Sequence, residues 1–379
     1  MMSCNAAVTS LLNGQAASGL RAEAGTEVMS YRDALHWTMR DALQRHYSVL
    51  IMGQGVDDHK GIFGSTTGLA QEFGADRVMD MPLAEEGMTG VAIGAALNGL
   101  YPIQTHIRAD FSLLAMNQII NLAAKYKYMF GGRFDVPMLI RMIVGRSWGQ
   151  GAQHSQSLQS LFAHIPGLRV VMPSSSQSIL DTYPAVIDRY RGPVISFEHR
   201  LMYDLQFYVA PLSPGQEIDP FGSRLVRPGE EVTIVATSIM VLEAMRAAEH
   251  LARVADIQCE VIDLHCVSSP DWDLVMRSVE KTGRLVVADT SWREYGVCAE
   301  VCRVVAERNP GCLKTPVVTL GMQPAPCPTA KCLEDLFYPD LRQLVDVLAS
   351  SVTGKPGHGV PLPDTQSMAD VYKRFKGPF

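Results

Sequence analysis

The chain has 379 residues, of which 47% are hydrophobic and 19% are charged, and its formal net charge is -6. This composition is that of a globular protein with about two or three domains. The acidic balance argues against binding to nucleic acid or to an anionic membrane surface, and no apolar run approaches the roughly 20 residues that cross a bilayer. We therefore expect a cytoplasmic protein without nucleic-acid or membrane partners.

The first 28 residues are rich in Ala, Ser and Gly and show little patterning. They lack the continuous apolar core of a secretory signal, and Glu23 and Glu27 argue against a transit peptide. We interpret residues 1–28 as a loose N-terminal extension, with Met29 as a second candidate start.

Strands and helices alternate between residues 29 and 200. The strand-like runs cover residues 49–52, 137–144, 168–172 and 194–197, and another begins at Pro102, whereas helical periodicity marks residues 31–45, 111–128 and 177–190. We expect the helix over 111–128 to be long and mostly buried. Because the strands are apolar runs rather than alternating patterns, they predict a parallel sheet covered on both faces, in a doubly wound α/β domain.

A second alternating unit follows residues 201–222, which are rich in Pro and Gly and are interpreted as a linker. This unit, residues 223–350, has predicted strands at 232–236, 259–264, 285–288 and 316–320, and predicted helices at 240–254, 271–281, 296–308 and 341–350. It indicates a second doubly wound domain. Residues 351–379 have little periodicity and are interpreted as an irregular tail that packs on a neighbour or is mobile.

The segment RVMDMPLAEEGMTGVAIGAALNG, which begins at Arg77, places two carboxylates between a strand-like run and a helix of small residues. A carboxylate at this poorly solvated junction is able to exchange a proton with a buried ligand. Alternatively, Glu85 and Glu86 are first-turn acids that the helix dipole stabilises. From this segment alone, the second interpretation describes the more common situation.

Motifs for phosphate and metal binding are weak or absent. Gly53-Gln54-Gly55 lacks the third glycine of a dinucleotide fingerprint, and the chain contains no Walker, HExxH or nucleophile-elbow sequence. Seven of the eight cysteines lie beyond residue 250, without a CxxC pair or a histidine cluster. We expect reduced, buried thiols and no metal site on this chain.

Several segments resemble, in order and spacing, the beta subunit of the thiamine-diphosphate-dependent 2-oxo acid dehydrogenase decarboxylating component, the family of pyruvate, branched-chain and acetoin dehydrogenases. They are GQGVDDHKGIFGSTTGL (from Gly53), FGADRVMDMPLAEEGMTGVAIGAALNGLYPI (from Phe73), ADFSLLAMNQIINLAAKYKYMFGG (from Ala109), GAQHSQSLQSLFAHIPGLRVVMPSS (from Gly151) and RPGEEVTIVATSIMVLEAMRAAEHL (from Arg227). The resemblance implies a transketolase-like pyrimidine-binding domain over residues 29–200 and a transketolase C-terminal domain over residues 223–350.

The resemblance also implies roles for individual residues. Glu85 takes the position of the glutamate that hydrogen-bonds the pyrimidine ring of thiamine diphosphate and stabilises the imino tautomer that deprotonates C2. Phe111 takes that of the aromatic residue stacked on this ring, and Leu83 is expected to add an apolar contact. His154 takes the place of an active-site histidine that binds the substrate carboxylate or assists acyl transfer. Glu86 keeps its interpretation as an exposed or capping acid.

The family holds the diphosphate and Mg2+ through a GDG motif and an Asn-containing segment, and this chain has neither. The resemblance therefore implies a separate alpha subunit that carries the GDG motif, an active site formed between subunits, and an alpha2beta2 assembly. This chain alone is expected to be inactive. A lipoyl acyltransferase is a further candidate partner, as the acceptor of the acyl group.

Departures from the family pattern leave alternatives open. Gln54 stands where a dehydrogenase beta subunit commonly has an acid, Leu114 replaces a polar residue, and His265 replaces an arginine. The leading hypothesis is a 2-oxo acid dehydrogenase subunit. A split transketolase or acyloin-forming synthase is the enzymatic alternative, and a scaffold subunit that has lost catalysis is the non-enzymatic one.

Overall fold

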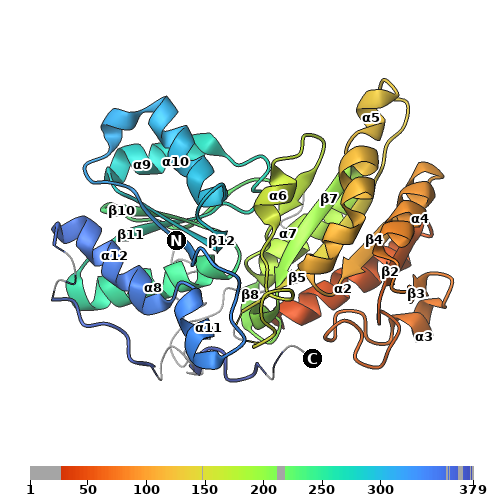
Figure 1. Ribbon diagram of the computed structural model, residues 1–379, viewed down its shortest axis with the longest axis horizontal. Helices are drawn as coiled ribbons and strands as arrows, with labels where there is room; N and C mark the ends of the chain where they lie inside the picture. Colours follow the sequence, from red (N-terminus) through yellow and green to blue (C-terminus); the bar gives the residue numbers. More distant parts are fainter. Residues whose placement is uncertain are drawn as a thin grey trace.

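The computed structural model describes residues 27–146, 148–210, 218–355, 357, 359–365, 370–375 and 377. Two α/β domains lie side by side (Figure 1). The predicted fold class, two doubly wound domains, is confirmed.

The first domain is built on a parallel sheet. Its strands are β2 (Val49–Gly53), β3 (Val78–Met79), β4 (Tyr101–His106), β5 (Met138–Val144), β6 (Arg169–Val171) and β7 (Pro193–His199). They lie in the order β3-β2-β4-β5-β7-β6, and each neighbouring pair is parallel. The carboxyl ends of all these strands therefore meet at one edge of the sheet.

Helices cover both faces of this sheet. On one face, α2 (Tyr31–Arg45) and α7 (Ser176–Arg189) pack their apolar residues against the strands. Both begin at a serine whose hydroxyl accepts a backbone N–H, Ser30 for α2 and Ser175 for α7. On the other face lie α4 (Glu85–Leu97) and the segments that follow β4. The shorter helices α3 (Leu69–Phe73) and α6 (Gln159–Ala163) complete the domain.

The prediction of a long, mostly buried helix over residues 111–128 is wrong in two respects. The chain instead forms a 3-10 helix, η1 (Ala109–Ala115), a π-helix, η2 (Gln118–Ala123), and a short α5 (Tyr126–Met129). Apolar periodicity does not distinguish these helix types, and the hydroxyl of Ser112 bonds the carbonyl of Ala109 within the 3-10 turn. Nor is the segment mostly buried, because Leu114, Tyr128 and Met129 are exposed.

The second domain is built on a mixed sheet. Its strands are β9 (Arg224–Arg227), β10 (Val232–Ala236), β11 (Cys259–Asp263), β12 (Leu285–Trp292) and β13 (Val318–Met322), in the order β13-β12-β10-β11-β9. Only the pairing of β9 with β11 is antiparallel among these described strands. In Figure 1, α8 (Ile239–Ala255) and α12 (Leu341–Thr353) lie below the sheet, and α9 (Trp272–Thr282) and α10 (Val297–Arg308) lie above it. The shorter elements of this domain are η4 (Pro310–Cys312) and α11 (Lys331–Phe337), whereas η3 (Arg200–Met202) follows β7 in the first domain.

The two domains share a core. Apolar residues of α4, η1 and η2 join those of α9 and α10 in one cluster that spans both domains. The backbone also crosses the boundary, because the N–H of Met172 donates to the carbonyl of His265 and that of Val267 donates to the carbonyl of Val170. The domains therefore hold the loops at their boundary in one fixed arrangement.

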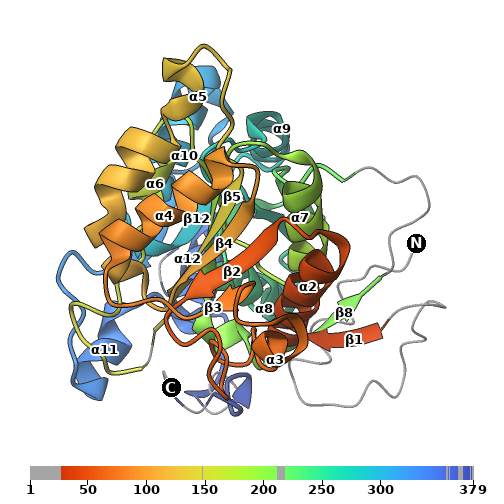
Figure 2. The ribbon, with the colours of Figure 1, turned by 90° about the vertical axis from the view of Figure 1, so that its right-hand side faces the viewer.

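The predicted connecting segments contain more regular structure than expected. Strand β1 (Glu27–Ser30) begins inside the predicted extension, and β8 (Gln206–Val209), inside the predicted linker, pairs antiparallel with it (Figure 2). Most of the extension lies outside the described residues. In the predicted tail, α12 continues to Thr353, and Tyr372 donates its hydroxyl proton to Glu243. The ring of Phe375 lies 5.3 Å from the guanidinium carbon of Arg200.

A fully buried ion pair lies inside the first sheet. Arg141 of β5 donates to both carboxylate oxygens of Glu198 of β7, at 2.6 and 2.8 Å. The hydroxyls of Tyr183 and Tyr203 donate to the same carboxylate at 2.6 and 2.5 Å. Arg141 also donates to the hydroxyl of Ser65, 3.0 Å away, in the loop after β2. The pair thus connects two strands, a helix and a loop.

We predict that Glu198→Gln lowers the free energy of unfolding by about 3–5 kcal/mol, because it leaves the buried charge of Arg141 without its counter-charge. Urea denaturation followed by circular dichroism measures this loss. The matched control is Arg303→Met, which removes an exposed cation 2.7 Å from Glu300 and should not move the midpoint measurably. Equal midpoints for the Glu198→Gln variant and the unmodified protein would contradict the assigned role of the pair.

Candidate active site at the carboxyl edge of the first sheet

A cavity of about 230 Å³ lies where β4 ends. Its wall combines a carboxylate, two histidines, an aromatic ring, several other polar side chains and two apolar ones. The residues are Gln54, Met81, Glu85, Thr105, His106, Ile107, Arg108, Phe111, Gln150 and His154. The carboxyl edge of a parallel sheet is where ligands bind in doubly wound folds. Three of the residues predicted from the sequence, Glu85, Phe111 and His154, meet in this cavity.

Glu85 is the first residue of α4 and is only 7% exposed. The amide of Gln54, from the loop after β2, donates to its carboxylate at 3.2 Å. Glu86, the next residue, is exposed and accepts a hydrogen bond from the amide of Gln118 at 3.0 Å. The helix start therefore turns one carboxylate into the cavity and the other toward solvent, as the sequence predicted for Glu86.

Phe111 and His154 are in contact on the wall of the cavity. Their ring centroids are 5.2 Å apart with an interplanar angle of 83°, an edge-to-face contact, and Phe111 is 39% exposed. Asp110 ties the two segments together, because it accepts hydrogen bonds from the backbone and side-chain nitrogens of Gln156 at 3.2 and 2.9 Å. Burial raises the pKa of Asp110, and the two Gln156 hydrogen bonds partly oppose this rise.

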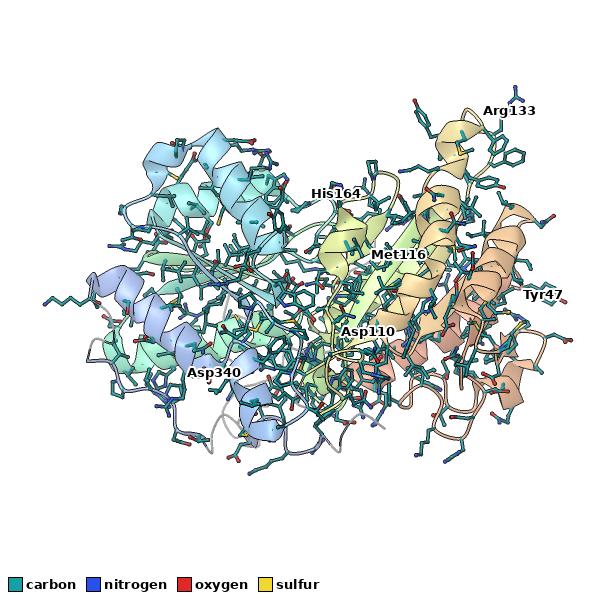
Figure 3. The ribbon with its side chains drawn as sticks, in the orientation of Figure 1. Tyr47, Asp110, Met116, Arg133, His164 and Asp340 are labelled. Atoms are coloured by element: carbon teal, nitrogen blue, oxygen red, sulfur yellow. The ribbon has the colours of Figure 1, made fainter. Side chains whose placement is uncertain are left out.

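The location of this site is visible in Figure 3. Asp110 lies near the boundary between the domains, whereas Arg133 lies at the far end of the first domain. The loop that carries His154 is also held by the second domain, where a carboxylate oxygen of Glu334 accepts the N–H of Gly149 at 3.1 Å. Both domains thus position the cavity wall.

Leu83 is the predicted residue that the structure does not bring into the cavity. It is 84% exposed and lies two residues before Glu85, outside the cavity lining. Its role as an apolar contact stays a prediction.

Sequence reasoning missed Arg108 and Gln150. The guanidinium of Arg108 donates to the side-chain oxygen of Gln150 at 2.8 Å and lies 4.5 Å from the centroid of the Trp148 ring. Burial lowers the pKa of Arg108 to about 10, so this side chain remains a cation at neutral pH. The available signal was the polar run QTHIRAD at the end of an apolar strand, where a ligand-binding edge is expected.

His106 was also missed. It is 4% exposed, and burial lowers the pKa of its imidazole to about 4, an effect that the negative charge of Glu85 only partly offsets. The imidazole is therefore neutral at pH 7. A neutral histidine has one N–H donor and one nitrogen acceptor to offer a bound molecule.

Comparison with known proteins identifies the family of the chain. The family model "Transketolase, pyrimidine binding domain" matches residues 27–206, and "Transketolase, C-terminal domain" matches residues 222–344. The pyruvate dehydrogenase E1 component subunit beta of Rhizobium meliloti (strain 1021) is 37% identical, over 86% of this chain and 70% of the relative. The chain belongs to the E1 beta-subunit family of 2-oxo acid dehydrogenases.

Two further relatives extend this family. The mitochondrial pyruvate dehydrogenase E1 component subunit beta-1 of Arabidopsis thaliana is 36% identical, over 85% of this chain and 89% of the relative. The acetoin:2,6-dichlorophenolindophenol oxidoreductase subunit beta of Cupriavidus necator is 37% identical, over 86% and 98%. A solved structure titled "Split gene transketolase, inactive beta4 tetramer" has a TM-score of 0.68 at 22% identity, over 86% of this chain and 98% of that one, and supports the fold alone.

Within the residues that the structure describes, no group of three or more His, Cys, Asp or Glu side chains is arranged to hold a metal ion. No helix in the described part of the chain is long and apolar enough to cross a membrane.

We predict that His106 makes the protein less stable in acid. Its pKa is about 4 in the folded state and 6.5 as an ordinary histidine, so between these values the unfolded chain binds a proton that the folded chain does not. The contribution of the neutral His106 to the free energy of unfolding is fully present above the ordinary pKa and is lost as pH falls. The loss is about 2 kcal/mol at about pH 5. Urea midpoints at about pH 7.5 and about pH 5 measure it, and His106→Gln should lose less stability than the unmodified protein over this interval. An identical loss in both proteins would contradict the buried, neutral imidazole.

Proposed function

We propose that the chain is the beta subunit of a thiamine-diphosphate-dependent 2-oxo acid dehydrogenase, which decarboxylates a 2-oxo acid and transfers the acyl group to lipoamide. The observation that carries this proposal is the position of Glu85, buried at the start of α4 and facing a cavity that Phe111 and His154 also line. Membership of the E1 beta-subunit family supports the same reaction class.

The cavity residues fit the pyrimidine half of thiamine diphosphate. Within the described part of the chain, the Glu85 carboxylate accepts one hydrogen bond, from Gln54, and has capacity left for a ring nitrogen. Phe111 offers a partly exposed aromatic face on which a planar ring can stack. When bound, the cofactor supplies a carbanion that adds to a 2-oxo group and accepts the electron pair released with carbon dioxide.

Each residue has a distinct task in this proposal. Glu85 holds a proton at the pyrimidine nitrogen and so makes the opposite amino group a base. Phe111 orients the ring and excludes water from one face, and Leu83 adds an apolar contact from the exposed side. His154 hydrogen-bonds the substrate carboxylate or assists acyl transfer, and the guanidinium of Arg108 makes the same wall attractive to an anion.

The remaining half of the site comes, in this proposal, from an alpha subunit that carries a GDG motif and holds the diphosphate and Mg2+. The sequence of this chain contains no GDG motif. Three apolar side chains in or next to α4 and η1 are exposed, Leu83 84%, Val91 57% and Leu114 60%. A methyl group added at Gly87 or Gly94 of α4 would meet nothing within 4 Å. Such a surface is suited to close contact with a partner, in an alpha2beta2 assembly.

We predict that Glu85→Gln lowers turnover at least about 100-fold, because an amide cannot exchange the proton that the carboxyl group exchanges. The measurement is release of carbon dioxide from a 2-oxo acid by the complex with the GDG-containing partner, with dye reduction as a second readout. Assembly of the complex, followed by gel filtration, should be unchanged. Glu86→Gln is the matched control and should keep full activity, because Glu86 faces solvent.

The same complex separates the competing functions. Unchanged turnover in Glu85→Gln would remove this residue from the mechanism. Cofactor binding without dye reduction would indicate acyloin formation or ketol transfer, and no cofactor binding by the unmodified complex would indicate a scaffold subunit.

A further inference from the structure

Strand β4 ends in consecutive buried polar side chains, Gln104, Thr105 and His106. Among the described residues, Gln104 Oε1, Thr105 Oγ1 and His106 Nε2 have no hydrogen-bond partner. The amide nitrogen of Gln104 is held by the hydroxyl of Thr89 at 2.9 Å, so its free oxygen has a fixed position. Native proteins pair the large majority of buried polar atoms, so these atoms at a strand end have hydrogen-bonding capacity left for a partner from outside the chain.

The group adjoins the site already described. Thr105 and His106 both line the cavity that contains Glu85. His106 is two residues after Gln104 on β4, and Gln104 bonds Thr89 of α4, so the side chain of His106 is on the sheet face covered by α4, the helix that Glu85 begins. Both Glu85 and His106 line this cavity.

The chemistry of His106 selects among the groups that could bind there. A bound carboxylate would pair best with a cationic side chain. A buried imidazole that stays neutral instead offers one hydrogen-bond donor and one acceptor. An aminopyrimidine ring presents amino donors and ring-nitrogen acceptors on its edge, and these match a neutral imidazole in either tautomer. The cationic side chain suited to a carboxylate is Arg108, elsewhere on the cavity wall.

We propose that His106 is a further cofactor-contacting residue. Its imidazole forms a hydrogen bond with a polar group on the edge of the pyrimidine ring, the same ring that Glu85 engages. This inference rests on the proposed function, because it takes thiamine diphosphate as the molecule in the cavity. It adds a polar contact from β4 to those expected from Glu85, Phe111 and Leu83.

The test compares two variants in the complex with the alpha partner. His106→Leu removes the hydrogen-bonding group at similar volume, and His106→Gln keeps a donor and an acceptor. Calorimetric titration of the cofactor-free complex with thiamine diphosphate and Mg2+ should show about tenfold weaker binding for His106→Leu, the effect of one lost hydrogen bond. Binding by His106→Gln should stay within about threefold of that by the unmodified complex.

Thermal unfolding of the cofactor-free complex provides a second readout. Because His106 Nε2 has no partner in the described chain, Leu should leave the unfolding temperature unchanged or raise it, while cofactor affinity falls. A purely structural role would lower that temperature. His199→Gln is the matched control, a buried histidine at the end of β7 that lies outside the cavity and should not alter cofactor affinity.

Each outcome decides the inference. Weaker cofactor binding by His106→Leu, with the unfolding temperature maintained, supports it. Cofactor affinity equal to that of the unmodified complex overturns it, whether or not turnover falls. Failure of the unmodified complex to bind thiamine diphosphate overturns the proposed function itself, which distinguishes the two failures.

Discussion

The buried contact between Arg141 and Glu198 is the interaction on which the first domain depends. It places two charges inside a sheet of apolar strands, and the hydroxyls of Tyr183 and Tyr203 complete the hydrogen bonding of the carboxylate. Burial opposes the charge on Arg141, and the attraction of Glu198 overcomes this, so the pKa of Arg141 is raised. Through Ser65, the same arginine holds the loop that begins beside Gln54. The hydrogen bond to Ser65 therefore connects the core of the sheet to the loop whose first residue, Gln54, lines the cavity.

The parallel direction of the strands then determines where chemistry is located. Because β2, β4 and β5 end at one edge, the loops that follow them bring Gln54, Arg108 and Gln150 to the same cavity, and α4 adds Glu85. The second domain steadies this edge, through Glu334 and through a shared apolar core. In the proposed function, this cavity is half of a cofactor site, and a partner subunit supplies the other half.

Apolar runs and turn residues were enough to predict the alternating domains, and the combination of motifs was enough to bring together Glu85, Phe111 and His154. Periodicity did not reveal the 3-10 and π segments after β4, since segments of seven and six residues are too short to separate their repeats from that of an α-helix. The buried charges within MLIRMIV and PVISFEH pair only across strands, which a linear pattern cannot show. The polar end of β4, including His106, was visible in the sequence, but its burial was not.

The most direct test of a shared cofactor site is an experimental structure of the complex of this chain and its GDG-containing partner with thiamine diphosphate and Mg2+. The account predicts the pyrimidine ring in the cavity at the end of β4, stacked on Phe111, with a ring nitrogen within hydrogen-bonding distance of the Glu85 carboxylate and the diphosphate on the partner. A pyrimidine ring bound elsewhere, with Glu85 making no contact to it, would contradict the account.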